Sequence, residues 1–338
     1  MLARPQLEFT DKSLSQENVW RKPDRSPLCM PSHAPGHQYP WLSAAIPSKD
    51  AAAFIIPLPG VLLGSRSQDL APRKASTKNA RPSKALTLVR KGQFLYGAVQ
   101  MNGSDIELAT THAYTVILDA LREMPECRLL RVWHYLPDIN SENNGIERYQ
   151  AFSRARYDAM AAYGYQMADD LPAASAIGTK SDHLVVHFIA AQGLATSIEN
   201  PRQMSAYRYP RQYGPRSPSF SRAILHNGKN QQQLFISGTA SIIGHTTVAP
   251  LEPERQTLIT LENLSLLLDS AGFPALSKLG SNADWCVYVR ARHLVAAIDP
   301  ILRERFGKDS RISYLEGDIC RQDLLVEIEG LIHRPIAP

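Results

Sequence analysis

The sequence of 338 residues contains few cysteines and no long apolar run. The four cysteines, Cys29, Cys127, Cys286 and Cys320, form no CxxC pair. This spacing excludes a disulfide framework and a zinc pattern, and it favours a reducing cytoplasm. The most apolar window, residues 51–64, is too short to cross a bilayer and contains two prolines. The N-terminus also lacks the pattern of a signal peptide, so we expect a cytoplasmic protein that has no contact with a membrane.

Several common active-site motifs are absent as well. We find no phosphate-binding glycine loop, no dinucleotide fingerprint and no metal cluster, so we predict no cofactor and no metal site. Ser237 lacks a GxSxG context, which excludes the usual serine hydrolase. The net charge of +5 and the pI near 9.0 suit either an anionic small molecule or nucleic acid. Because no dense Lys/Arg run occurs, a pocket is favoured over a nucleic-acid surface.

The most unusual composition lies between residues 206 and 222, AYRYPRQYGPRSPSFSR. No Asp or Glu occurs between Glu199 and Glu252, so the arginines of this segment have no counter-ions nearby in the sequence. Three prolines exclude a helix interior or a central strand. Arginine binds carboxylates with paired donors, and tyrosine adds a hydroxyl to a flat apolar ring. We interpret this segment as one wall of an anion site, the alternative being a solvated basic loop.

The hydrophobic pattern predicts an α/β fold with two related halves. A leucine-rich helix precedes RVWHYLPDI in one half and CVYVRARHL in the other, and a second helix follows each. We therefore expect two copies of a β-β-α-β-α-β unit, each an open sheet with helices on one face. The predicted limits are an irregular segment 1–45, a first domain 46–175 and a second domain 176–338. The expected helices are 112–124 (capped by Thr111), 146–163, 255–271 and 293–306; the expected strands are 52–63, two within 85–101, 129–136, 183–191, 234–243, 285–291 and 324–329.

Two glutamates on the last predicted strand are candidates for acid–base chemistry. Glu327 and Glu329 are two residues apart, so both side chains point to the sheet face opposite Leu324, Val326 and Ile328. A carboxyl in a partly closed site has a raised pKa because of burial and its like-charged neighbour, which suits a general acid. The alternative is a pair of solvated glutamates on an exposed strand. Cys320 and His245 are expected to be packed side chains rather than a nucleophile and a base.

The motifs of the chain resemble a known family. Residues 254–272, 287–294 and 323–330 are similar to the RidA (YjgF) fold. The longer, ordered set resembles the chorismatases, which are built from two RidA-like domains and cleave pyruvate from chorismate. That set is RVWHYLPDIN, NGIERYQAFSRAR, residues 200–223, FISGTASIIGH and DICRQDLLVEIEG. The resemblance runs from about Leu88 to Gly330.

The resemblance implies roles for individual residues. The family places its general acid at the first glutamate of the VEIE strand, here Glu327, and binding residues at Tyr213 and Arg216 of YGPR. Phe220 takes a position that the family can fill with tyrosine. Arg148 and Arg290 are further candidate partners for the carboxylates of the substrate.

Two positions bear on the product, and they disagree. The family members that form 3-hydroxybenzoate resemble this chain at Cys320, whereas Ala240 is more typical of the hydrolytic members. We expect 3-hydroxybenzoate, with 4-hydroxybenzoate as a second product; the alternative is the dihydroxycyclohexadiene carboxylate. A RidA-type imine deaminase and a polyanion-binding module remain open as other functions. We expect a monomer that binds the small molecule chorismate and no nucleic acid.

Overall fold

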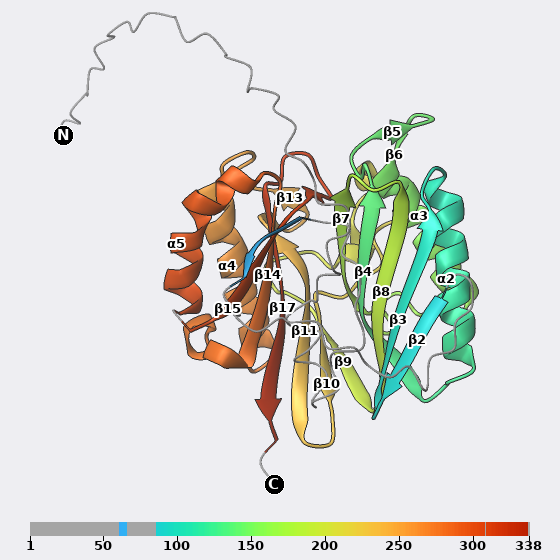
Figure 1. Cartoon of the computed structure of the whole chain (residues 1–338), viewed down its shortest axis with the longest axis horizontal. Helices are drawn as coiled ribbons and strands as arrows, with labels where there is room; N and C mark the ends of the chain where they lie inside the picture. Colours follow the sequence, from blue (N-terminus) through green and yellow to red (C-terminus); the bar gives the residue numbers. More distant parts are fainter. Residues whose placement is uncertain (1–60, 66–85, 308, 337–338) are drawn as a thin grey trace, which may run out of the picture. The chain divides into compact units, whose positions relative to one another are not determined.

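The computed structural model describes residues 61–65, 86–307 and 309–336. These residues form two mixed sheets that face each other, each with two helices on its outer side (Figure 1). The strand order of the first sheet is β16-β7-β4-β8-β3-β2, and that of the second is β1-β15-β14-β17-β11-β10-β9. The layers are therefore helix, sheet, sheet and helix. The predicted segment 1–45 and most of the predicted strand 52–63 lie outside the described residues.

The first unit runs through six elements in the predicted order, followed by one additional strand. They are β2 (Leu86–Lys91), β3 (Phe94–Asn102), α2 (Ile106–Arg122), β4 (Cys127–Pro137), α3 (Arg148–Ala162), β7 (Ala173–Thr179) and β8 (His183–Gln192). A small hairpin of β5 (Glu142–Asn143) and β6 (Ile146–Glu147) lies between β4 and α3.

The second unit repeats this order. Its elements are β10 (Ala223–Asn227), β11 (Gln231–Ala240), α4 (Pro253–Ser270), β14 (Ala283–Val289), α5 (Val295–Phe306), β15 (Arg311–Glu316) and β17 (Val326–Pro335). Short additional strands are β1 (Val61–Ser65), β9 (Leu194–Ile198), β12 (Ile242–Ile243), β13 (Thr246–Thr247) and β16 (Asp318–Ile319).

The predicted repeat is confirmed by the pairing of the strands. In each unit the third and fourth strands pair in parallel, β4 with β7 and β14 with β15, and the other pairs are antiparallel. The predicted α/β class, with helices on one face of each sheet, is therefore confirmed. Each unit also receives an additional strand beside its fourth strand, because β16 pairs with β7 and β1 pairs with β15.

The limit between the sheets lies later in the chain than residue 175. β8 pairs with β3 and β4, so the expectation that residues 183–191 open the second half is wrong. The chain leaves the first sheet after β8 and enters the second at β9, and Gly193 lies between them. The strand order explains this: β8 is the fifth strand of the first unit and lies between the parallel pair β4–β7 and the antiparallel hairpin β2–β3. We therefore place the limit between the units at Gly193.

Local signals explain most helix ends and correct two predictions. Asp105, not Thr111, caps α2, and its side chain accepts a hydrogen bond from the backbone N–H of Leu108 (3.0 Å). α4 ends as predicted before Gly272, which has a φ of +67°. Leu258 of that helix is 41% exposed, whereas Leu261, Leu264 and Leu268 are buried. The last strand begins at Val326 and not at Leu324.

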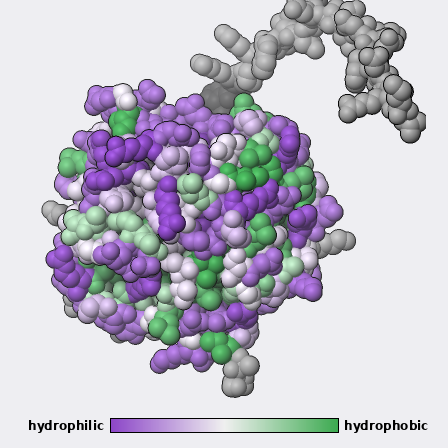
Figure 2. Space-filling model, turned by 180° about the vertical axis from the view of Figure 1, so that it is seen from behind, coloured by the Kyte–Doolittle hydropathy of each residue, from purple (hydrophilic) through white to green (hydrophobic). Residues whose placement is uncertain are grey.

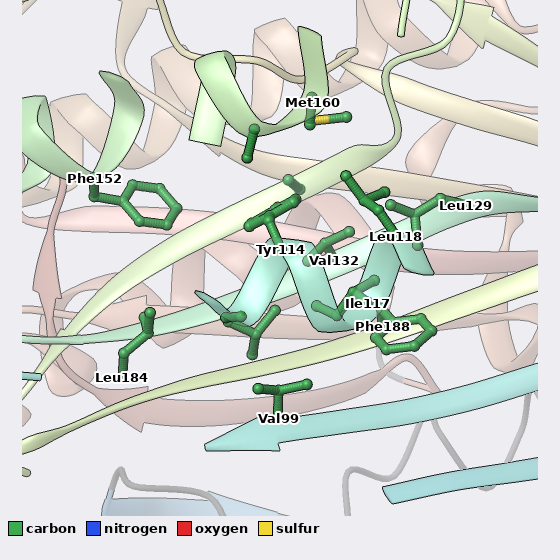
Figure 3. Close-up of a cluster of buried hydrophobic side chains, with 14 of the residues drawn as sticks. Val99, Tyr114, Ile117, Leu118, Leu129, Val132, Phe152, Met160, Leu184 and Phe188 are labelled. Atoms are coloured by element: carbon green, nitrogen blue, oxygen red, sulfur yellow. The ribbon is translucent and has the colours of Figure 1, made fainter. Parts of the chain in front are cut away.

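Each helix pair covers its own sheet with a separate apolar core. Figure 3 shows the first of these, in which Tyr114, Ile117 and Leu118 of α2 lie against strand residues such as Val132 and Phe188. In the second core, Leu261, Leu264 and Leu268 of α4 pack with strand residues that include Val287 and Ile328. These cores fix the outer faces of both sheets.

A third cluster joins the inner faces of the two sheets. It contains Trp133 and Tyr135 of β4 together with Cys286 and Tyr288 of β14. The hydroxyl oxygens of Tyr135 and Tyr288 are 3.3 Å apart. Because each sheet buries both of its faces, a polar group on an inner face is removed from water.

The outer surface seen from the opposite side is mostly hydrophilic. Figure 2 shows apolar residues in small patches scattered among polar ones. None of the helices in the described residues is long and apolar enough to cross a membrane.

Candidate active site

A cavity of about 450 Å³ opens where the two sheets meet the irregular segment 199–222. Its walls come from distant parts of the chain: the β5–β6 hairpin, the start of α3, the arginine–tyrosine segment, β11, the turn after β16 and β17. The lining residues with polar or aromatic side chains are Asn140, Glu142, Glu147, Tyr149, Gln150, Tyr209, Gln212, Tyr213, Phe220, Arg222, Cys320, Arg321, Gln322 and Glu327.

β17 presents both predicted glutamates to the space between the sheets. Val326 and Ile328 pack on the helix side, as expected from the alternation, whereas Leu324 lies in a separate small cluster with Ile319. Glu329 is 3% exposed and fully engaged. It accepts hydrogen bonds from Arg131 (2.6 Å), the indole N–H of Trp133 (2.8 Å), the Tyr288 hydroxyl (3.1 Å) and the Ser175 hydroxyl. Glu329 is therefore held as a structural carboxylate.

Glu327 is in the opposite situation. It is 4% exposed and lines the cavity, yet among the described residues no hydrogen bond reaches its carboxyl group. Burial, together with the nearby negative charge of Glu329, raises the pKa of Glu327 to about 8, against the opposing effect of Arg131 and Arg222. The group is thus mainly a neutral acid at pH 7, with a proton to give to a ligand in the cavity.

Gly238 explains how the carboxyl reaches this position. A Cβ at Gly238 would lie 1.9 Å from Oε1 of Glu327 and 3.0 Å from the Ser175 hydroxyl. The pairing of β11 with β17 is irregular between Ile236 and Thr239, which brings this glycine beside the acid. The small side chains of SGTA, residues 237–240, thus let the Glu327 side chain approach the strand closely.

The arginine–tyrosine segment forms one wall of the cavity. It is irregular, with two short 3₁₀ turns at Ala206–Arg208 and Arg211–Tyr213. Of its arginines only Arg222 lines the cavity, where it donates to the Tyr209 hydroxyl (2.9 Å) and to the carbonyl of Met204 (2.7 Å). Its Nε is buried and has no hydrogen-bond partner among the described residues. A ligand could therefore accept a bond from Arg222.

Two other arginines of this region have counter-ions from distant elements. Arg202 pairs with Glu262, and Arg216 pairs with Asp158 at 3.2 Å. The acid-free stretch of sequence thus does not leave all its arginines unpaired in space. Arg216 stacks over Tyr157 and does not line the cavity.

Tyr213 lines the cavity, and residues that the sequence did not associate with it contact its side chain. Its hydroxyl is 3.1 Å from Nδ1 of His245, and the guanidinium of Arg321 lies 4.1 Å from its ring centroid. Arg321 also donates to the Thr247 hydroxyl at 3.2 Å. Arg321 therefore brings a second positive charge to the cavity beside Arg222.

Phe220, Ala240 and Cys320 also line the cavity. Ala240 pairs with Glu327 across the β11–β17 ladder. Burial and the neighbouring Glu327 raise the pKa of the Cys320 thiol to about 12, so it is a neutral thiol and not a thiolate nucleophile. These three residues shape the cavity next to the acid.

The other two arginine candidates do not line the cavity. Arg148 donates to the backbone carbonyls of Pro137 (2.8 Å) and Gly103. Arg290 pairs with Asp318 (2.6 Å) and donates to the carbonyl of Arg321 (2.8 Å). Both bind backbone, and Arg290 thereby holds the segment that carries Cys320 and Arg321.

Tyr149, Gln150 and Arg321 line the cavity without a signal in the sequence that could have selected them. Arg222 was visible in the arginine-rich segment, but nothing in the sequence separated it from Arg216. Among the residues that the structure describes, no three His, Cys, Asp or Glu side chains are grouped as metal ligands.

The raised pKa of Glu327 should appear in the stability of the protein. The folded state keeps the Glu327 proton up to about pH 8, whereas the unfolded chain loses it near pH 4.5. The free energy of unfolding contributed by this group is therefore greatest below pH 4.5 and falls as the pH rises towards 8. Urea denaturation between pH 5 and 8 should show a steeper fall for the wild type than for Glu327→Gln. The exposed Glu304→Gln serves as a control, and equal slopes for all three proteins would contradict a raised pKa.

The contact at Gly238 gives a second test. Gly238→Ala forces the Glu327 carboxyl to move and should lower the free energy of unfolding by about 1–3 kcal/mol. In a Glu327→Ala background only the 3.0 Å contact with the Ser175 hydroxyl remains, so the same change should cost clearly less. A double-mutant cycle in urea measures this coupling. Equal losses in both backgrounds would show that Gly238 does not accommodate the acid.

Comparisons with known proteins agree with one another. Residues 73–190 match the family model "Chorismatase FkbO/Hyg5-like, N-terminal". A 3-hydroxybenzoate synthase from Streptomyces hygroscopicus is 36% identical over 260 residues, covering 73% of this chain and 76% of the relative. A chorismatase from Streptomyces rapamycinicus is 36% identical over 253 residues, covering 72% and 75%. A chorismatase crystal structure aligns with a TM-score of 0.69 and 31% identity, over 77% of this chain and 80% of that one. The chain belongs to the chorismatase family.

Proposed function

We propose that this protein cleaves chorismate, with Glu327 as the general acid, to release pyruvate and 3-hydroxybenzoate. The observation that carries the proposal is a buried carboxyl with a pKa of about 8 in the wall of a cavity that also contains Arg222 and Arg321. The cavity volume of about 450 Å³ lies within the usual range for small-molecule sites. The similarity to a 3-hydroxybenzoate synthase and to chorismatases supports the choice of substrate.

The chemistry follows from the position of the acid. Glu327 donates its proton to the methylene carbon of the enolpyruvyl group, which becomes a methyl group, and the ether carbon becomes an oxocarbenium. The ring C–O bond then breaks, and its electron pair forms the carbonyl of pyruvate. The ring hydroxyl takes the place of the departing oxygen, and its proton restores the acid form of Glu327. The bond from this oxygen to its original ring carbon then breaks, and the ring carbon that now carries the oxygen passes its proton to it, which yields aromatic 3-hydroxybenzoate.

Chorismate carries two carboxylates, and the cavity offers positive charge for them. The Nε group of Arg222 is free among the described residues, and Arg321 is held over Tyr213. Charge-assisted hydrogen bonds from such groups bind a carboxylate strongly at a site with little water. We assign Tyr213 and Phe220 to the walls that contact the substrate, and we propose Arg222 in place of Arg216.

Cys320 favours aromatisation over hydrolysis. The thiol is neutral and lies beside Glu327, where it occupies space that a water molecule would need to attack the oxocarbenium. Ala240 on the neighbouring strand is the feature that favours hydrolysis, so a mixed product that includes 4-hydroxybenzoate is part of the proposal. The alternative is a hydrolytic enzyme that forms the dihydroxycyclohexadiene carboxylate.

The proposed enzyme acts as a cytoplasmic monomer, without membrane or nucleic-acid partners. The two units bury their inner faces against each other, which supports a monomer. Cys127, Cys286 and Cys320 are all free thiols, which supports a reducing compartment. A RidA-type imine deaminase would need none of the arginine–tyrosine wall, and a polyanion binder would need its arginines exposed and unpaired.

Glu327→Gln should retain the fold, because the amide has the shape of the acid. The rate of pyruvate release should fall by at least about 100-fold, because the amide has no transferable proton. Pyruvate can be measured with lactate dehydrogenase after incubation with chorismate. Glu304→Gln, which changes an exposed carboxyl, is the control and should keep full activity. A wild-type protein that releases no pyruvate would overturn the proposed function, and an active Glu327→Gln would overturn the assignment of the acid.

Cys320→Ala tests the role assigned to the thiol. The smaller side chain opens space beside Glu327, so the product should shift from 3-hydroxybenzoate towards the dihydroxycyclohexadiene carboxylate. Liquid chromatography of the products measures the ratio. The buried Cys286→Ala, outside the cavity lining, is the matched control and should leave the ratio unchanged. The same ratio in wild type and Cys320→Ala would show that the thiol only fills space.

A further inference from the structure

A second hollow in the molecule shares no lining residue with the active-site cavity. It has a volume of about 900 Å³ and is lined by residues 91–94, 192–193 and 227–231. These residues belong to the β2–β3 turn, the link from β8 to β9 and the β10–β11 turn. We call this hollow the hairpin groove.

The hairpin groove lies at the end of the sheets that is remote from the acid. β11 runs from Gln231 in the groove to Ala240 in the active-site cavity, and ten strand residues span about 30 Å. In Figure 1 the β10–β11 turn lies at the lower end of its sheet, and the β5–β6 hairpin beside the active-site cavity lies at the upper end. A ligand in the groove therefore does not contact the active-site cavity.

Contacts between distant segments hold the walls of the groove. A Cβ on Gly228 would lie 2.7 Å from Nε2 of Gln93, so the tips of the two hairpins touch. A Cβ on Gly193 would lie 3.3 Å from the carbonyl oxygen of Asn227, so the link between the units packs on the same tip. The backbone N–H of Gln192 donates to the carbonyl of Gln93 (3.0 Å). The groove is thus formed before any ligand enters it.

The lining of the groove carries positive charge and many amide groups. The described residues that line it are two lysines, five asparagines or glutamines, three glycines and Phe94, with no acid among them. Lys91 lies two residues after Val89, which packs in the cluster between the sheets, so its side chain points to the same inner side. Its Nζ is buried and has no hydrogen-bond partner among the described residues.

Lys91 also has no counter-ion in the described part of the chain. None of the ion pairs there includes it. Its neighbour Arg90 pairs with Glu126 at 2.7 Å, and Glu126 also accepts a hydrogen bond from the side chain of Gln192 (3.2 Å). A buried ammonium group without a partner is unfavourable, so an anion that enters the groove gains electrostatic attraction.

We propose that the hairpin groove binds a phosphorylated small molecule, whose phosphate group is held by Lys91 and Lys229. An ammonium group offers three N–H donors and is a common phosphate ligand in proteins. Lys229 is exposed in the turn between β10 and β11, where it lines the same groove. The site is separate from the proposed reaction.

The rest of the ligand is chosen by the amide groups. The side chains of Gln93, Asn230 and Gln231 line the groove and form no hydrogen bond with the described residues. A side-chain amide both donates and accepts hydrogen bonds, which suits the hydroxyl groups of a sugar. The groove volume of about 900 Å³ is in the range of small-molecule sites, so it holds more than a phosphate ion. The ligand class is therefore a sugar phosphate.

The test measures binding of ribose 5-phosphate to the whole chain by isothermal titration calorimetry at constant ionic strength. The wild type should bind it with a dissociation constant of about 1 mM or lower, and it should bind ribose and inorganic phosphate more weakly. Lys91→Met should raise the dissociation constant at least about 10-fold, as expected for the loss of a charged hydrogen-bonding partner. Lys229→Met should raise it less, because the exposed ammonium is screened by solvent.

Two control variants locate the binding. Arg222→Met removes a positive charge from the active-site cavity, and Lys278→Met removes an exposed lysine that does not line the groove. Both should leave the dissociation constant within about twofold of the wild-type value. Binding that is lost in Arg222→Met but kept in Lys91→Met would place the sugar phosphate in the active-site cavity and overturn the proposal. A wild type that binds no ribose 5-phosphate at about 10 mM would overturn it as well.

A thermal melt separates binding from a merely structural role of Lys91. Lys91→Met removes an unpaired ammonium group, so without ligand the variant should melt at the same temperature as the wild type or higher. Ribose 5-phosphate should raise the melting temperature of the wild type and not that of Lys91→Met. An equal rise in both proteins would overturn the role of Lys91. Neither measurement uses chorismate, so both remain valid if the proposed function fails.

Discussion

The site depends on the unequal treatment of two carboxylates on one strand. β17 directs Glu327 and Glu329 into the same closed space between two sheets, where two negative charges are unfavourable. Glu329 accepts hydrogen bonds from Arg131, Trp133, Tyr288 and Ser175, and these bonds stabilise its negative charge. Glu327 receives no hydrogen bond from the described residues and keeps its proton instead, with a pKa of about 8. One carboxylate thus stabilises the sheet interface, and the other becomes an acid because it is buried and lies near the negative charge of the first.

The repeat explains why only one unit carries this acid. The two units have the same strand order, and Tyr135 and Tyr288 occupy matching places whose hydroxyl groups meet. Tyr288 pairs with Glu327 on β17, whereas Tyr135 pairs with Val185 on β8. His187, two residues after Val185, occupies the position on β8 that Glu329 occupies on β17. Burial lowers the pKa of His187 to about 3. The first unit therefore has no acid at these two positions, and it contributes walls and Arg131 to the site of the second.

Much of the fold could be predicted, since alternation and helical spacing depend on neighbours in the chain. The repeat, the sheet face of Glu327 and the end of α4 at Gly272 followed from such local signals. Among the arginines, prediction failed. Arg148 and Arg290 do not line the cavity and bind backbone carbonyls, and Arg216 meets an acid 58 residues earlier in the chain. Composition identified an arginine-rich wall, but it could not identify which guanidinium had been left without a partner.

By itself the sequence determined the order of the elements, the shared face of Glu327 and Glu329, and the family to which these motifs belong. Only the tertiary structure decided which carboxylate has hydrogen-bond partners and which of the arginines line the cavity. The physical reason is that a protonation state or an unmet hydrogen bond depends on burial and on partners brought together from distant segments. A residue's immediate neighbours in the chain determine neither.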